Sequence, residues 1–207
     1  NSGIEPTIVC DAGGLQSGDQ FPIGVTVVTC TATDDAGNEA SCSFTITVND
    51  EEDPTINCPI DFYEVTDPGK PGAIVTWEVT SDDNSGIEPT IVCDAGGLQS
   101  GNQFPIGVTV VTCTATDDAG NEASCPFTIT INDEEDPTIN CPIDFYEVTD
   151  PGKPGAIVTW EVTSDDNSGI EPTIVCDAGG LQSGDQFPIG VTVVTCTATD
   201  DAGNEAS

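Results

Sequence analysis

The stretch that decides the fold reads Val108-Thr-Val-Val-Thr-Cys-Thr-Ala-Thr116. In its later part Val111, Cys113 and Ala115 alternate with threonines, so apolar and polar side chains would point to opposite faces of an extended chain. Such alternation is typical of a strand with one buried face. The stretch therefore predicts a β-strand whose Val111 face lies in a core.

Shorter stretches of strand character surround this one, and turn sequences rich in Asp, Asn, Gly and Pro separate them at 67–72, 82–86, 94–97 and 117–121. No segment combines a helical period with capping signals. About seven short strands in one repeat predict an all-β fold, an immunoglobulin-like or fibronectin III-like β-sandwich. The expected strands are Ile56–Cys58 with Phe62–Val65, Ile74–Val79 (Val75, Trp77 and Val79 on one face), Pro89–Cys93, Phe104–Ile106, Val108–Thr116 and Ser124–Ile131 (Cys125, Phe127, Ile129 and Ile131 inward).

The sequence repeats itself every 83 residues, because Asn1-Ser-Gly-Ile-Glu-Pro6 returns at Asn84 and at Asn167. The frame predicts the C-terminal part of one module at 1–49, a complete module at 50–132 and a module without its last strand at 133–207, called below the first, second and third copies. We expect the chain to be a window of a longer protein. A catalytic site is needed once, whereas a scaffold gains from copies, so the repeat predicts a protein that is not an enzyme. The aligned copies differ only at Asp19/Asn102/Asp185, Ser43/Pro126 and Val48/Ile131.

The charge of the chain is strongly negative: 37 acidic residues stand against two lysines, which gives −35 without any arginine or histidine. Nucleic acid and anionic membranes are excluded as direct partners, since a phosphate-binding surface must supply cations. Cations are the expected partners. Such a charge favours disorder, but 36% hydrophobic residues in regular alternation and ten cysteines predict small folded cores.

The cysteines indicate an oxidising, extracellular setting. The second copy carries four of them, at Cys58, Cys93, Cys113 and Cys125, with no CxxC pair and no histidine. This pattern predicts a disulfide framework rather than a zinc site or reduced core thiols. Four cysteines allow three connectivities, and spacing alone does not choose among them.

Several motifs at matching spacing resemble the hyalin repeat (HYR) domain family, and the resemblance covers the whole chain. It implies an immunoglobulin-like fold, an extracellular location and a role in calcium-dependent adhesion of cells or matrix. Near-identical tandem copies further suggest a fibrous, hyalin-like matrix protein. The motifs are Asp53-Pro-Thr-Ile-Asn-Cys-Pro59, Val75-Thr-Trp77, Phe104-Pro-Ile-Gly107, Val111-Thr-Cys-Thr-Ala-Thr-Asp117 and Ala119-Gly-Asn-Glu-Ala-Ser-Cys125 before Phe127.

The sandwich order of this family favours one disulfide pattern. The third strand should neighbour Val108–Thr116, which brings Cys93 to Cys113, and the first strand should run beside the last, which brings Cys58 to Cys125. Equivalent short-range pairs would join Cys10 to Cys30 and Cys176 to Cys196. Cys42 and Cys141 then have no partner within the chain, because the window cuts their modules or because they bond a neighbouring chain.

Acidic residues gather at the junctions between copies, in Asn-Asp-Glu-Glu-Asp-Pro at 49–54 and again at 132–137. In a sandwich, the linker lies at the same pole as two Asp-rich turns, so the carboxylates could converge. Oxygen ligands in that number suit Ca²⁺, which takes six to eight of them. The predicted calcium ligands are Asp50, Glu51, Glu52, Asp53, Asp82, Asp83, Asp117, Asp118 and Asn121, and in the third copy Asp133, Glu134, Glu135, Asp136, Asp165, Asp166, Asp200, Asp201 and Asn204.

Other interpretations remain open for several of these residues. Asp-Asp-Asn-Ser-Gly and Asp-Asp-Ala-Gly-Asn also form turns without a metal ion. Adjacent carboxylates such as Asp82 and Asp83 seldom aim at one bond, which argues against a glycosidase pair. Trp77 and Trp160 fit a core better than a ligand platform. Lys70 and Lys153 are exposed turn residues, or they anchor an acidic pole of another module.

The sequence thus predicts a secreted or surface-displayed structural filament of HYR-type modules. Its expected partners are other copies of itself and a cell-surface receptor, and its expected ion is structural Ca²⁺. One alternative is an acidic matrix protein that stores cations or associates with mineral. A second is a bacterial surface stalk.

Overall fold

A computed structural model describes residues 3–207, and the chain is all-β, as the sequence predicts. Within the described residues no helix is long and apolar enough to cross a membrane. Two compact units divide the chain: Asn1–Asn57, Thr80–Val92 and Thr114–Ser124 form the first, and Cys58–Val79, Cys93–Cys113 and Cys125–Ser207 the second. Each unit therefore contains part of the second copy.

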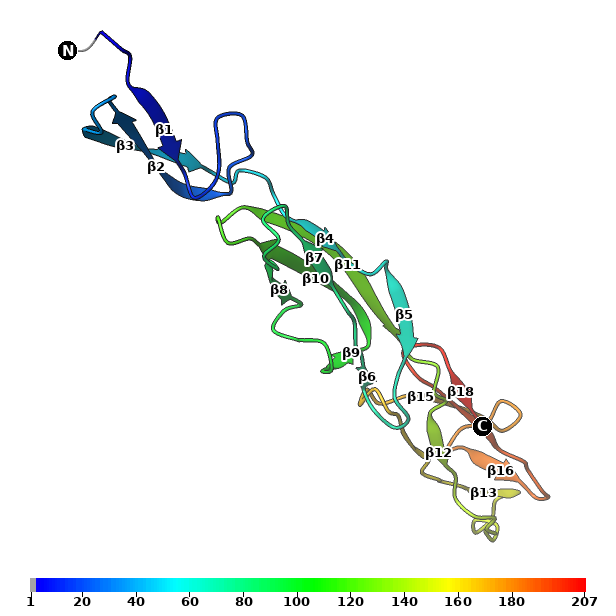
Figure 1. The fold of residues 1–207 in the computed structure, drawn as a ribbon. Coiled ribbons are helices and arrows are strands. Elements are labelled where there is room, and N and C mark those ends of the chain that lie inside the picture. The colour runs from blue at the N-terminus through cyan, green and yellow to red at the C-terminus, as the bar shows by residue number, and fades with distance from the viewer. Residues whose placement is uncertain (1–2) are drawn as a thin grey trace. The chain divides into compact units, whose positions relative to one another are not determined.

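The first copy forms one antiparallel sheet in the order β1-β2-β3 (Figure 1), built from β1 (Thr7–Asp11), β2 (Gly24–Thr33) and β3 (Glu39–Val48). Cys10 lies opposite Cys30, and Cys30 lies opposite Cys42. Large apolar side chains of this sheet stay accessible, and Phe44 is 52% exposed. Within residues 3–49 the structure describes this three-stranded sheet alone.

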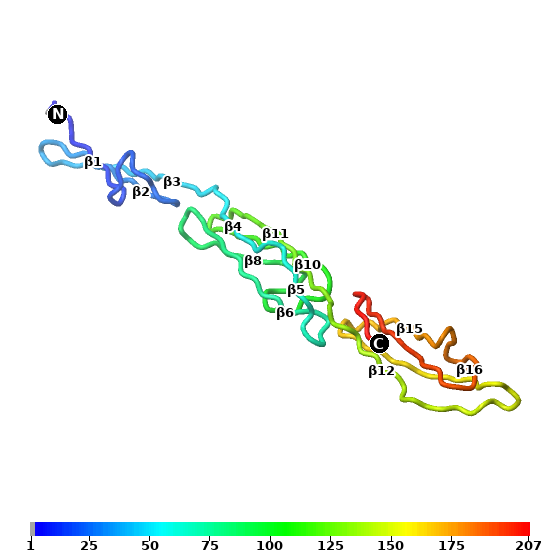
Figure 2. Tube along the Cα trace, turned by 90° about the vertical axis from the view of Figure 1, so that its right-hand side faces the viewer, coloured from blue at the N-terminus to red at the C-terminus, as the bar shows by residue number. Residues whose placement is uncertain are grey.

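The second copy contains strands β4 to β11, and Figure 2 follows the path of the chain through several of them. One sheet has the order β5-β11-β10-β8, in which β5 runs parallel to β11. Antiparallel pairs β4 with β7 and β6 with β9 supply the remaining ladders. The bounds are β4 Thr55–Asn57, β5 Phe62–Val65, β6 Gly72–Ile74, β7 Thr80–Asp82, β8 Thr90–Asp94, β9 Gln103–Pro105, β10 Gly107–Thr116 and β11 Glu122–Asn132.

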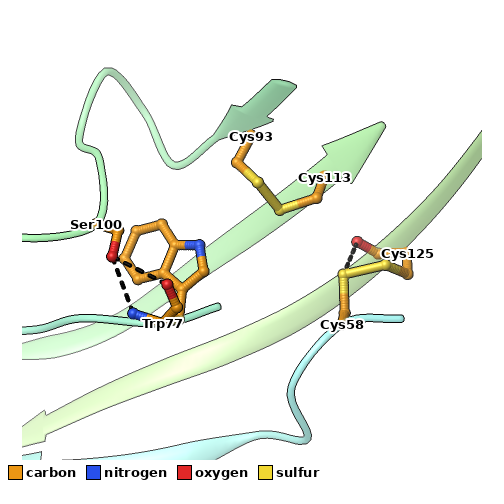
Figure 3. Close-up of a disulfide and its surroundings, with 6 residues drawn as sticks. All are labelled: Cys58, Trp77, Cys93, Ser100, Cys113 and Cys125. Carbon is orange, nitrogen blue, oxygen red and sulfur yellow. Dashed lines mark hydrogen bonds between the residues drawn. A yellow bond between two sulfur atoms is a disulfide. The ribbon is translucent and has the colours of Figure 1, made fainter. Parts of the chain in front are cut away.

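One predicted strand of the second copy is wrong. Ile74–Val79 does not form a continuous ladder, because Val75 to Val79 lie between β6 and β7 without strand pairing. The Val75–Val79 segment lies beside a turn instead of a strand. The Val75 N–H donates to the Asn102 carbonyl, and the Val75 carbonyl accepts from the Gly101 N–H. The Ser100 hydroxyl bridges the N–H and C=O of Trp77 (Figure 3). The predicted facing still holds, since Val75 is 2% exposed while Thr76 and Glu78 face solvent.

Aromatic rings join the two layers of this sandwich. The indole of Trp77 contacts Phe104 and Phe127 edge-on, at centroid distances of 5.5 and 5.8 Å. Phe127, Ile129 and Ile131 of β11 are at most 2% exposed, and they face the core as the alternation predicts. Edge-to-face ring pairs of this kind add stability beyond the buried area.

Gly72 allows β6 to approach β9 closely. A Cβ built on Gly72 would lie 2.0 Å from the carbonyl oxygen of Phe104. Any side chain there would have to push the two backbones apart. Gly72 therefore permits the close pairing of β6 with β9.

The third copy repeats the second but pairs fewer strands. Its order is β15-β17-β18, with β12 paired to β14 and β13 to β16. Residues 133–207 contain no counterpart of Cys125–Asn132, and Phe145, Tyr146 and Val191 are accordingly exposed beside an open groove of about 600 Å³. The bounds are β12 Thr138–Asn140, β13 Gly155–Ile157, β14 Thr163–Asp165, β15 Thr173–Asp177, β16 Gln186–Pro188, β17 Thr195–Thr199 and β18 Glu205–Ala206.

Four disulfides lie within residues 3–207, and they join the pairs that the sandwich order favours. Cys93 of β8 bonds Cys113 of β10, and Cys58 bonds Cys125 of β11 (Figure 3). The first and third copies each contain the short-range bond, Cys10–Cys30 and Cys176–Cys196. In this described part of the chain, Cys42 and Cys141 are exposed free thiols.

Candidate metal centres

Three aspartates from separate segments meet where the second copy begins. Asp50 precedes β4, Asp83 follows β7 and Asp117 follows β10, and all three belong to the first compact unit. One carboxylate oxygen from each lies within 4.8 Å of the others. We call this set the first carboxylate cluster.

The turn after β10 fixes the position of Asp117. Its Oδ1 accepts hydrogen bonds from the backbone N–H groups of Gly120 (2.6 Å) and Asn121 (2.8 Å), and its Oδ2 accepts one from the Asn121 side chain at 2.7 Å. Burial by itself would raise the pKa of Asp117, but these hydrogen bonds, with that of Ala119, outweigh it and lower the pKa. Asp117 is therefore held ionised while only 8% exposed.

The turn after β7 positions Asp83, whose Oδ2 accepts hydrogen bonds from the backbone and hydroxyl of Ser85. Its Oδ1 is buried and has no hydrogen-bond partner among residues 3–207. The neighbouring Asn84 reaches across to the linker, where its Nδ2 donates to Asp50 Oδ1 (3.2 Å) and Glu52 Oε2 (2.9 Å). The turn and the linker thus hold each other in place.

The same arrangement recurs where the third copy begins, with Asp133, Asp166 and Asp200, all within the second compact unit. We call this set the second carboxylate cluster. Asp133 and Asp200 are 8% and 7% exposed. Burial alone would raise the pKa of Asp200, but hydrogen bonds from the Asn204 side chain and the backbone of Asn204, Gly203 and Ala202 lower it. Across the described chain, Asp133 Oδ2 and Asp166 Oδ1 are buried without a hydrogen-bond partner.

Both clusters fit a hard cation. Three carboxylates held within 4.8 Å repel one another, and the sequence offers only two basic residues, Lys70 and Lys153, to offset its acidic charge. The donor atoms are all oxygens, and buried oxygens without hydrogen-bond partners remain in each cluster. Such a donor set suits Ca²⁺ better than Zn²⁺, which prefers nitrogen and sulfur ligands.

The structure brings together only part of the predicted ligand set. Asp82 instead accepts a hydrogen bond from the N–H of Asp83, and the Glu52 carboxylate accepts one from Asn84. Asn121 and Asn204 orient Asp117 and Asp200 and donate to the carbonyls of Asp50 and Asp133. The other predicted ligands that lie outside both clusters are Glu51, Asp53, Asp118, Glu134, Glu135, Asp136, Asp165 and Asp201.

Sequence reasoning missed two asparagines, Asn84 and Asn167. Both follow the clustered aspartates directly, and Asn167 Nδ2 donates to Asp133 Oδ1 at 3.0 Å. Their place in Asp-Asp-Asn-Ser-Gly looked like turn chemistry alone. The sequence did contain one signal: each asparagine offers a side-chain hydrogen-bond donor next to a group of carboxylates that has few other donors.

Comparisons with known proteins agree with this architecture. The family model of the HYR domain matches residues 1–48, 49–131 and 132–207. The chain belongs to the HYR domain family. The matched segments begin one residue before the predicted second and third copies, and the predicted boundaries themselves stay a prediction.

Sequence relatives of this HYR chain include hyalin from Lytechinus variegatus, 39% identical over all of the chain and 39% of that protein. Hyalin from Strongylocentrotus purpuratus is 37% identical over 92% of the chain and 16% of that protein. A rat sushi, von Willebrand factor type A, EGF and pentraxin domain-containing protein is 37% identical over 97% of the chain, which spans 5% of it. The chain thus spans well under half of these relatives.

Solved structures similar to this HYR chain include protocadherin and hemolin chains. A protocadherin gamma B3 EC1–4 structure has a TM-score of 0.39 at 12% identity and covers 98% of this chain and 62% of its own. The insect immune protein hemolin has a TM-score of 0.34 at 14% identity, with coverages of 97% and 66%. TM-scores this low carry no argument about function.

Proposed function

We propose that this chain is part of an extracellular structural or adhesive protein whose carboxylate clusters hold calcium at the start of each copy. The disulfide-bonded, all-β copies support an oxidising, extracellular location. Repeated near-identical copies support a structural role over a catalytic one. Other copies of the chain and a cell-surface receptor are its proposed partners.

The observation that carries the calcium proposal is the convergence of three aspartates from three segments, repeated in two clusters. Separate turns hold Asp83 and Asp117 in place before any ion arrives. A bound ion would offset the mutual repulsion of the carboxylates and supply a partner for the buried oxygens. Extracellular modules typically bind calcium with a dissociation constant of about 10⁻⁴ to 10⁻³ M.

Calorimetric titration of the full chain with calcium chloride tests this proposal. We expect two sites, one for each cluster. Asp83→Asn should remove one site and Asp166→Asn the other, whereas the exposed neighbours Asp118→Asn and Asp201→Asn are matched controls that leave both sites intact. Equal loss from the clustered and control variants would contradict the assignment.

The alternative of a cation-storing matrix protein makes a different prediction for the same titration. Storage by the polyanion as a whole would give many weak sites that no single aspartate controls. The gathering of particular carboxylates, buried and held by hydrogen bonds, favours a few defined sites. The number of sites therefore separates the two functions.

Assembly into filaments is the remaining part of the proposal. Near-identical copies present the same surface repeatedly, and repeated head-to-tail contacts build open filaments. At a charge of −35, such contacts require cations that bridge or screen the acidic faces. Light scattering should show association in calcium but not in sodium chloride with a chelator. Equal association in both would show that screening alone is responsible.

A further inference from the structure

A turn of the second copy lies against the second carboxylate cluster. The turn Asp67–Gly72 is closed by its own hydrogen bonds, from Asp67 N–H to the Gly72 carbonyl and from Lys70 N–H to the Asp67 carbonyl, both 2.9 Å. Two further hydrogen bonds link it to the third copy. Gly69 N–H donates to Glu135 Oε2 at 2.8 Å, and the Lys70 carbonyl accepts from Asn167 Nδ2 at 3.1 Å. All of these residues belong to the second compact unit.

Asn167 connects that turn to the cluster. Besides the Lys70 carbonyl, its Nδ2 lies within hydrogen-bonding distance of Asp133 Oδ1 (3.0 Å) and of the Thr66 hydroxyl (3.3 Å). The Thr66 hydroxyl in turn donates to Asp133 Oδ1, at 3.3 Å. The side chain of Asn167 therefore touches both the turn and a carboxylate of the cluster.

Glu135 also contacts both Asp133 and the turn, with two different groups. Its backbone N–H donates to Asp133 Oδ1 at 3.2 Å, while its carboxylate accepts from Gly69. The position of Asp133 thus sets the positions of both contacts with the turn. Anything that moves the Asp133 carboxylate should disturb Glu135 and Asn167 together.

The atoms that an ion would satisfy lie on these same residues. Asp133 is only 8% exposed, yet its Oδ2 has no hydrogen-bond partner within the described chain, and neither do Asp166 Oδ1 and Asn167 Oδ1. Without a cation, like charges at the three aspartates push Asp133 away from Asp166 and Asp200. With one, the carboxylates are drawn together and Asp133 is fixed.

We propose that calcium binding at the second carboxylate cluster locks the Asp67–Gly72 turn of the second copy onto the third copy through Glu135 and Asn167. This inference rests on the proposed function, because it takes calcium as the ion of the cluster. What it adds is the identity of the segment that responds to the ion, the Asp67–Gly72 turn of the second copy. An occupied second cluster would then fasten the second copy to the third, so that ion binding there and the connection between these two copies are one equilibrium.

The chain contains its own control for this proposal. The turn Asp150–Gly155 has the same sequence and the same internal hydrogen bonds as Asp67–Gly72. Within residues 3–207, however, no side chain of another copy bonds it. Gly69 and Gly152 are therefore chemically matched amides in one molecule, and only Gly69 donates to a neighbouring copy.

Hydrogen–deuterium exchange of the full chain, measured in calcium chloride and in chelator, compares these two amides. The peptides around them are identical, so the exposed Ile74→Val marks the second-copy peptide by its mass. We expect calcium to slow exchange at Gly69 by about 5- to 150-fold, the usual range for coupling between two sites, and to leave Gly152 unchanged. Glu135→Ala should abolish the slowing at Gly69 while the calorimetric site at the second cluster remains.

The outcomes separate this inference from the proposed function. If calcium binds at the second cluster but Gly69 and Gly152 exchange alike, the lock is wrong and the calcium site stands. If Asp166→Asn has no effect on calcium binding, both are wrong. If Glu135→Ala leaves the slowing at Gly69 intact, the turn is held by contacts other than those proposed.

Discussion

Strands β3 and β11 have nearly the same sequence but different surroundings. Phe44 of β3 is 52% exposed, whereas its counterpart Phe127 of β11 is 2% exposed and touches the rings of Phe62 and Trp77. Each strand pairs with an equivalent neighbour, β3 with β2 and β11 with β10. What differs is supplied by residues before β8: the second copy adds β5 beside β11 in the same sheet and the segment that carries Trp77. Strand formation is thus local to a pair, while burial needs the whole copy.

The largest expected difference between β11 and β3 is the loss of stability when the phenylalanine ring is removed from each. Phe127→Ala deletes a buried ring from the core, which typically costs about 3–5 kcal/mol, while Phe44→Ala should cost about 0.5 kcal/mol, as for a surface site. Urea unfolding followed by Trp77 fluorescence in a Trp160→Phe chain reports on the second copy, and circular dichroism reports on the whole. Equal effects of the two alanines would show that β3 is covered in solution.

The cysteines make a second contrast between the same strands. Cys125 of β11 closes a 67-residue loop with Cys58, whereas Cys42 of β3 is free. Replacing both Cys58 and Cys125 with serine should destabilise the second copy by about 4 kcal/mol, the chain-entropy value for that loop. Cys42→Ser should leave the melting temperature unchanged. A loss on Cys42→Ser would indicate a bond to another chain, which electrophoresis without reductant would reveal.

Calcium should stabilise the fold through the turn that follows β10 but not through the equivalent turn that follows β2. Asp117 belongs to a cluster, and Asp34, held by the same kind of turn, belongs to none found in the described chain. At 10 mM calcium and a dissociation constant of about 10⁻³ M, binding should stabilise by about 1.4 kcal/mol per site. Asp117→Asn should remove the calcium-dependent rise in melting temperature of the second copy, and Asp34→Asn should not. A rise that survives Asp117→Asn would place the ion elsewhere.

The smallest expected effect is the acid sensitivity of these two turns, measured in chelator. The hydrogen bond from the Asn38 side chain is the main cause of the lowered pKa of Asp34, and hydrogen bonds from Asn121 and Gly120 outweigh burial to lower the pKa of Asp117. A lowered pKa in the folded state stabilises the fold above the ordinary aspartate pKa of about 3.9, and that contribution disappears as the pH falls through the folded value.

Replacing the aspartate isolates this contribution. The gap in melting temperature between the parent chain and Asp117→Asn should narrow from pH 6 to pH 3, and Asp34→Asn should behave alike. Asp118→Asn, at an exposed position beside Asp117, is the control and should show a constant small gap. A gap for Asp117→Asn that does not change with pH would contradict the assignment.

Much of the fold could be predicted from the sequence, because alternation reports which face of a strand is buried. It placed Val111, Cys113 and Ala115 in the core, and each is 0% exposed. It failed at Val75–Val79, where the alternation of burial is present without a ladder. The period of two records the facing of side chains, and it does not record whether the neighbouring segment is a strand or a turn.

The candidate site was predicted less completely, because composition shows how many carboxylates a pole holds but not which of them converge. Asp83 and Asp117 lie in the first cluster, while their neighbours Asp82 and Asp118 face solvent. That choice depends on the turns after β7 and β10, whose hydrogen bonds involve Ser85 and Asn121. The contact between Glu135 and Gly69 joins two copies, and a pattern that is read within one repeat cannot show it.

The bond between Cys58 and Cys125 also determines how far a copy can lengthen when the chain is pulled. Tension enters the second copy before Cys58 and leaves it after Cys125, so the residues between them are shielded from the load while the bond is intact. Subtracting the 67-residue separation from the 83-residue period leaves 16 residues that can be drawn out. At about 3.5 Å per residue this is about 55 Å, against about 290 Å for a reduced copy. An array of such copies would yield in short steps under force and keep most of each sandwich folded.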